Sequence, residues 1–91
     1  MSPLKLPATL LHDQADACLA QWVTQLPPVL PPAVSLDASE LSEFDSSALA
    51  VLLGLRRVLI HKGTALRVEG MPQRLRELAS LYGVMDLLQP A

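Results

Sequence analysis

Two short alternating stretches, separated by a long apolar helix, constrain the fold of this chain more than any other feature. Val34–Ala38 and Leu66–Glu69 alternate apolar and polar side chains, the pattern of a half-buried β-strand. Between them, residues 46–62 have the length and apolar character of a helix, and Gly63 suits the left-handed position that ends one. Strands joined by a crossover helix lie parallel, so the sequence predicts a mainly parallel small sheet with helices packed over it.

The N-terminal part of the chain predicts one more strand and one more helix. Leu4–Leu10 is mostly apolar but contains Pro7, which cannot donate to a strand ladder, so an edge strand is expected. The apolar residues of 14–26 fall near one helical face, with Asp13 as the candidate N-cap. The prolines from Pro27 onward end this helix.

The C-terminal part predicts a third helix. Pro72 suits the first helical position, the apolar residues of 72–82 recur at helical spacing, and Gly83 ends the helix. Val84–Leu88 is short and apolar and is expected to pack back on the body of the domain. Together these elements predict an α/β fold in a single domain over residues 1–91, a length typical of one domain.

Composition excludes several classes of protein. Hydrophobic residues make up 51% of the chain, enough for a core without disulfides, and the single cysteine, Cys18, indicates a reducing compartment. The net charge of −2 and the absence of long basic runs argue against binding nucleic acid. The longest apolar stretch, Ala48–Leu55, is far shorter than the roughly 20 residues of a membrane span.

No motif in the chain predicts catalysis, a metal or a cofactor. Cys18 lies on an amphipathic helix, and His12 and His61 lack the spacing of metal ligands. Asp37 and Asp45 could approach each other as a carboxylate pair, but the sequence supplies neither a base nor a pocket for them. The chain is therefore expected to be a binding protein and not an enzyme.

The expected start of the apolar helix, Asp45-Ser46-Ser47, is the candidate site. The first backbone N–H groups of a helix have no partner within the helix and create positive potential. A hydroxyl there can bind a docking protein, or it can accept a phosphate. The alternative interpretation is plain capping of the helix by Asp45 or Ser46.

The motif residues around this helix start resemble those of STAS domains, which occur in anti-anti-sigma factors and in the cytosolic tails of sulfate transporters. The pattern D-x-S-x-L followed by D-[ST]-x-x-L is matched by the following residues: Asp37, Ser39, Leu41, Asp45, Ser46 and Leu49. The stretches LAVLL, LRVEGM and LASLYGV are similar to the MlaB branch of the family, the small STAS subunit of the Mla phospholipid-transport ABC system. The likeness runs from about Val34 to the end, with Trp22 matching a helix tryptophan, and a counterpart of the first STAS strand is expected to be absent.

This resemblance implies a function through a partner. In the MlaB branch, Ser46 would contact an MlaF-like ABC-type ATPase that is bound to a membrane permease, which would place the chain in the cytoplasm, peripheral to the inner membrane. The implied role is to regulate or stabilise that ATPase in phospholipid trafficking that maintains outer-membrane lipid asymmetry. In the anti-anti-sigma branch, Ser46 would instead be phosphorylated in a partner-switching cycle. The usual glycine two residues later is Ala48 here, which weakens the second interpretation.

The apolar helix carries two stripes, of which one can face the sheet. The first comprises Leu49, Leu52, Leu53, Leu59 and Ile60, and the second comprises Ala48, Val51, Leu55 and Val58. The second stripe is expected to be covered by a partner, or alternatively by a neighbouring helix of the same domain. The predicted partner-binding residues are Asp45, Ser46, Ser47, Ala48, Val51, Leu55 and Arg56.

Overall fold

The computed structural model describes residues 4–88. Its elements in chain order are β1 (Leu4–Lys5), β2 (Thr9–Leu10), α1 (His12–Gln25), β3 (Ala33–Asp37), β4 (Glu43–Phe44), α2 (Ser47–His61), β5 (Ala65–Glu69), α3 (Gln73–Leu81) and α4 (Met85–Leu88). Residues 1–3 and 89–91, which belong to the expected domain over 1–91, lie outside the described residues.

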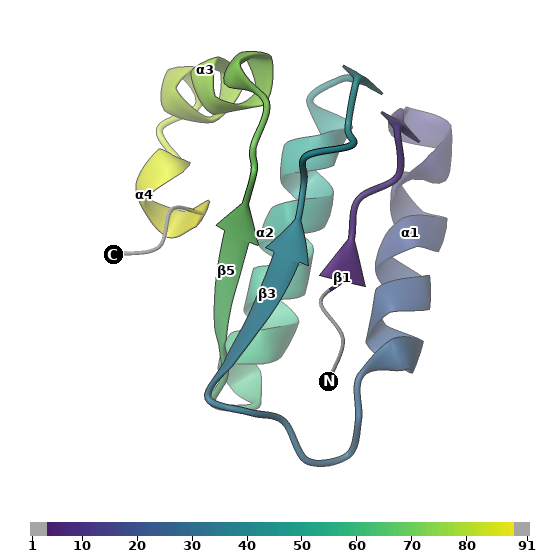
Figure 1. Cartoon of the computed structure of the whole chain (residues 1–91), viewed down its shortest axis with the longest axis vertical. Helices are drawn as coiled ribbons and strands as arrows, with labels where there is room; N and C mark the ends of the chain where they lie inside the picture. Colours follow the sequence, from purple (N-terminus) through teal and green to yellow (C-terminus); the bar gives the residue numbers. More distant parts are fainter. Residues whose placement is uncertain (1–3, 89–91) are drawn as a thin grey trace.

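Strands β1, β3 and β5 form a sheet in the order β1-β3-β5, and both pairings are parallel (Figure 1). Leu36 at the centre of this sheet lies opposite Leu4 on β1 and opposite Val68 on β5. α2 connects β3 to β5 and is the predicted crossover helix. The expected α/β fold with a mainly parallel sheet is therefore confirmed.

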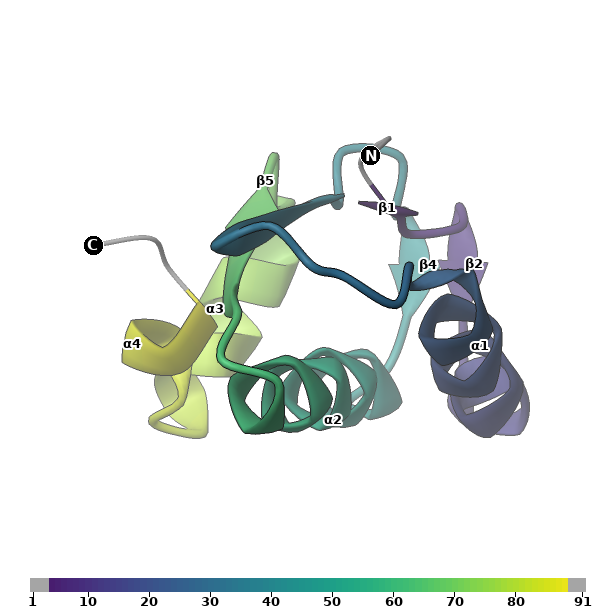
Figure 2. The same cartoon turned by 90° about the horizontal axis from the view of Figure 1, so that it is seen from below.

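The sheet has one packed face and one open face. Val34 and Leu36 of β3 are buried and alternate with half-buried residues, while on β5 Leu66 and Val68 alternate with exposed ones. Figure 2 shows α1 and α2 on the same side of the sheet, with α2 beneath β3 and β5. The apolar half of each strand faces this layer, because side chains alternate between the two faces of a strand.

The N-terminal strand differs from its prediction over Leu4–Leu10. Pro7 separates β1 from β2, and β2 pairs with β4 in a second, two-stranded parallel ladder. The backbone N–H groups of Ser42 and Glu43 both donate to the Ala8 carbonyl, at 2.8 and 3.0 Å, and lead into that ladder. β4 has only two residues, too few to show the alternation of a strand in the sequence.

The helix ends agree with the predictions to within two residues. α1 begins at His12, so Asp13 lies inside the first turn and the prediction of Asp13 as the N-cap is wrong. The Leu11 N–H at that end instead donates to the side-chain oxygen of Gln14, at 3.0 Å. Gly63 and Gly83 have φ of 76° and 72° and follow α2 and α3 in the left-handed conformation that the sequence predicts.

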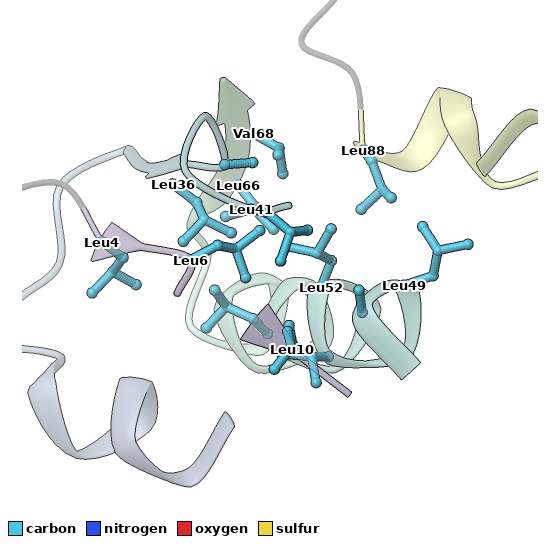
Figure 3. Packing of buried hydrophobic residues seen from close by; sticks show 14 of the residues in the cluster. Leu4, Leu6, Leu10, Leu36, Leu41, Leu49, Leu52, Leu66, Val68 and Leu88 are labelled. Atoms are coloured by element: carbon cyan, nitrogen blue, oxygen red, sulfur yellow. The ribbon is translucent and has the colours of Figure 1, made fainter. Parts of the chain in front are cut away.

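The core lies between α2 and the sheet (Figure 3). Leu36 from the sheet and Leu52, Leu55 and Leu59 from α2 are all 0% exposed. Leu88 of α4 is also 0% exposed, so the last described segment packs back on the body as expected. Within residues 4–88, no helix combines the length and the apolar character needed to cross a membrane.

Candidate functional site

The starts of α1, α2 and α3 lie together at the end of the molecule toward which β3 and β5 point, at the top of Figure 1. This arrangement follows from parallel strands with crossover connections, because each connection leaves the carboxyl end of a strand. The two segments that carry the predicted motif, Asp37–Ser39 and Asp45–Ser47, occupy this end of the domain.

Asp45 joins the starts of two helices. One carboxylate oxygen, Oδ1, accepts a hydrogen bond from the Ser47 N–H at 2.9 Å, at the first residue of α2. The other, Oδ2, accepts from the His12 N–H at 3.2 Å, at the first residue of α1. His12 Nδ1 also lies 3.3 Å from Ser47 Oγ. The carboxylate therefore satisfies one unpaired N–H of each helix and fixes their starts side by side.

The hydrogen bond from the Ser47 N–H, followed by the Ser47 hydroxyl and His12, holds the pKa of Asp45 below its ordinary value. We expect Asp45→Ala to lower the melting temperature at neutral pH by about 4–8 °C, because two helix ends lose their acceptor. A group with a depressed pKa stabilises the fold above its unfolded pKa, and this contribution is lost as the pH falls through its folded pKa. Thermal melts from pH 7 down to about 3 should therefore show the difference between the variant and the wild type shrinking below about pH 4.

Asp13→Ala is the matched control for this prediction. Asp13 also lies in the first turn of α1, but the first N–H of that helix, on His12, donates its hydrogen bond to Asp45. Replacing Asp13 should lower the melting temperature clearly less than replacing Asp45 does. Equal losses for the two variants would contradict the bridging role of Asp45.

Ser46 lies at the N-cap position of α2, is exposed, and makes no side-chain capping hydrogen bond. Its backbone is αR, with φ −62° and ψ −16°, whereas a capping serine has extended backbone. Of the two capping candidates, Asp45 therefore fills the role. The Ser46 hydroxyl is left pointing to the surface of the domain without a capping function.

The first half of the motif forms the turn that leaves β3. The Ser39 N–H donates to Asp37 Oδ1 at 2.9 Å, and hydrogen bonding from Ser39 holds the pKa of Asp37 below its ordinary value. Gly70, with φ 68°, packs against this turn: a Cβ at Gly70 would lie 3.0 Å from the Ser39 Cβ. Asp37 and Asp45 thus have different hydrogen-bond partners, and the structure gives each a local structural role.

The predicted second stripe of α2 is not on the surface. Ala48 and Leu55 are 0% exposed and Val51 is 2% exposed, so these three belong to the hydrophobic core, and Val58 is half-buried. The domain itself buries these three side chains, with α1 packed against α2, so they are not exposed for a partner to cover. Arg56 is half-buried and Ser47 is partly buried.

The exposed side of α2 is a third stripe, rotated toward α3. It comprises Ser46, Ala50, Leu53, Arg57 and Ile60, residues that recur at helical spacing.

A shallow depression of about 330 Å³ beside Ser46 is lined by Ser46, Leu49, Ala50, Leu53, Tyr82 and Val84. A second one of about 350 Å³ is lined by Phe44, Asp45, Ser46, Arg74, Glu77, Leu78 and Leu81. Ser46 belongs to both and lies between them.

Exposed apolar side chains accompany these depressions. Leu81 is 80% exposed and Tyr82 is 59% exposed, at the end of α3. We call the surface formed by Phe44, Ser46, Ala50, Leu53, Leu81 and Tyr82 the Ser46 surface. Large apolar side chains gathered at one place on a small domain mark an interaction site more often than scattered ones do.

Comparison with known proteins decides the family. A family model described as "Mlab, STAS domain" matches residues 3–89 of the chain. The chain belongs to the MlaB-type STAS family. Among curated proteins, none matches the chain. The match extends beyond the resemblance seen from Val34 onward and includes the segment of β1, β2 and α1.

STAS domains are in general regulatory and interaction domains that bind other proteins. In this STAS domain, no group of three or more histidine, cysteine or acidic side chains within residues 4–88 is arranged to hold a metal ion. Cys18 is half-buried on α1, and burial raises the pKa of its thiol, which leaves it less reactive.

Sequence reasoning missed most of the Ser46 surface of this STAS domain. Ala50, Leu81 and Tyr82 were not among the predicted site residues, and Leu53 was assigned to the core stripe. The sequence did hold a sign that Leu81 is exposed. The apolar stripe that marks the packed face of α3 comprises Leu75, Leu78, Ala79 and Tyr82, and Leu81 lies off this stripe. Nothing in the sequence predicted that Tyr82 is exposed, because it belongs to that stripe.

Proposed function

We propose that this STAS domain is a non-catalytic subunit that binds the ATPase of a Mla-type ABC transporter for phospholipids, and that it docks through the Ser46 surface. The observation that carries the proposal is the exposed Ser46 hydroxyl, which is free of capping because Asp45 holds the helix start. The match to an MlaB-type family model over residues 3–89 supports the transporter branch. The domain would regulate or stabilise the ATPase, in the cytoplasm and beside the inner membrane.

The geometry supports docking through the helix start for a physical reason. Ser46 offers a short hydroxyl that can donate or accept, and it is flanked by half-buried Leu53 and exposed Leu81. An interface of this kind combines an apolar centre with a few polar groups that fix its register. No group in this surface needs to react for it to work, in keeping with a role in binding.

The test is direct binding to the ATPase subunit encoded beside this chain in its genome. We expect the purified pair to associate at micromolar or lower Kd in calorimetry, corresponding to about −8 kcal/mol or better. Pull-down from solubilised native membranes should recover the permease with the pair. Failure of the purified pair to associate would overturn the transporter assignment.

The same exposed hydroxyl also suits the alternative function, a partner-switching protein that is phosphorylated on Ser46. Intact-mass measurement on the chain purified from its native host distinguishes the two. The transporter assignment expects Ser46 to be unmodified. Stoichiometric phosphate on Ser46 would favour the partner-switching cycle.

A further inference from the structure

A cation, Arg74, lies beside the Ser46 surface and contacts the ring of Phe44. The Arg74 guanidinium lies over the ring of Phe44, 5.4 Å from the ring centroid. This contact links α3 to the residue that precedes Asp45 and Ser46, and Arg74 and Ser46 line the same depression. A cation over an aromatic face is attracted by the ring, and this contact uses none of the guanidinium N–H groups as hydrogen-bond donors to a carboxylate.

Helix stability does not explain an arginine at this position. Arg74 is the second residue of α3, where the helix dipole disfavours a positive charge. The first turn of α3 contains no acidic residue. A cation in this place and held by an aromatic ring therefore calls for an explanation outside the helix itself.

The carboxylates that line the same depression are engaged with other groups. Asp45 accepts hydrogen bonds from the backbone N–H groups of Ser47 and His12. Glu77 Oε1 accepts a hydrogen bond from Gln73 Nε2 at 3.2 Å. The hydrogen bonds of both acids thus go to groups other than Arg74, which is exposed and lines the depression beside Ser46 and Leu81.

We propose that Arg74 is the charged anchor of the Ser46 surface and binds a carboxylate of the docking partner. The partner would carry an aspartate or glutamate next to apolar side chains, the acid lying at Arg74 and the apolar groups on Leu81 and Tyr82. The fork of an arginine matches a carboxylate with two parallel hydrogen bonds, so this pairing also fixes the orientation of the partner. This inference rests on the proposed docking function and names the chemistry of the partner at that site.

The experiment measures ATPase binding for Arg74→Glu, Arg74→Lys and Arg76→Glu. Arg76 is the matched control: it lies on the same helix two residues further on, is exposed, and lines a different depression with Met71 and Met85. We expect Arg74→Glu to weaken binding about 30-fold or more, Arg74→Lys about 3- to 10-fold, and Arg76→Glu less than about threefold. Raising the salt concentration should weaken wild-type binding more than binding of Arg74→Glu.

The outcomes separate this inference from the proposed function. A wild-type chain that does not bind the ATPase overturns the docking function itself. Wild-type binding that Arg74→Glu and Arg76→Glu reduce equally, or not at all, overturns the role of Arg74 alone. An effect of Arg74→Glu seen only in chain phosphorylated on Ser46 would also overturn it, because Arg74 would then serve a phosphate of its own domain. Circular dichroism of each variant serves as the folding control.

Discussion

Ser46→Arg is expected to weaken binding to the ABC ATPase about a hundredfold or more, without lowering the melting temperature of the domain. Ser46 lies between the two depressions of the Ser46 surface, so a long side chain there would fill space that the partner needs. The new cation would also lie beside Arg74 and repel it, where the partner is proposed to supply the opposite charge. The effect on the fold is small because Ser46 is exposed and makes no capping hydrogen bond.

A graded series at this position makes the result specific. Ser46→Ala removes at most one hydrogen bond and should lower the affinity for the ATPase by up to roughly tenfold. Ser46→Glu should lower the affinity more, because the new carboxylate competes with that of the partner for Arg74. Ala20→Arg, which adds the same side chain to an exposed position of α1, is the control and should bind like the wild type. Wild-type affinity in all the Ser46 variants would place the interface elsewhere on the domain.

The arrangement of strands and helices followed from the sequence because each signal was local. Alternation marked β3 and β5, and Gly63 and Gly83 marked the ends of α2 and α3. Short elements were less well defined: β1, β2 and β4 have two residues each and become strands only through pairing with a distant partner. A contact between Thr9 and Glu43 leaves no pattern in either segment alone.

The capping of α1 could not be predicted for the same reason. Asp13 had the residue type and the position of an N-cap, and no local rule favours a carboxylate 33 residues further along the chain. In the fold, β2 and β4 lie side by side and bring the start of α1 next to the start of α2. Asp45 then reaches both helices, and the cap comes from tertiary structure.

The sequence and the structure agree on the start of α2 as the candidate site, but they leave different sides of that helix open to a partner. Ser46 and Asp45 were identified from the motif, and both are exposed at the start of α2. The helix is apolar on nearly every side, so periodicity alone could not say which side α1 would cover. The packing of α2 against the sheet and α1 decides this, and it leaves Leu53 half-buried at the surface and Leu55 in the core.

Leu55→Ala tests this assignment of sides and should destabilise the domain by about 2–5 kcal/mol. Leu55 is 0% exposed, and removing its side chain loses buried apolar contacts and leaves a cavity in the core. A loss of that size is a large fraction of the 5–15 kcal/mol that holds a typical domain together, so it should be plain in urea unfolding. If the variant does not fold, Leu55→Val is expected to fold and to lose about 0.5–1.5 kcal/mol, in the range of a single buried methylene.

Ile60→Ala is the matched comparison on the same helix, because Ile60 is 48% exposed and a similar truncation there removes much less buried surface. We expect it to cost less than about 1 kcal/mol. Folded Leu55→Val should bind the ATPase with wild-type affinity, since the side chain is buried in the core and lines neither depression of the Ser46 surface. One result would show instead that this side of α2 is the docking side: a Leu55→Ala protein that unfolds at the same urea concentration as the wild type but no longer binds the ATPase. A buried leucine cannot be truncated without loss of stability, so unchanged stability would mean that Leu55 is not part of the core.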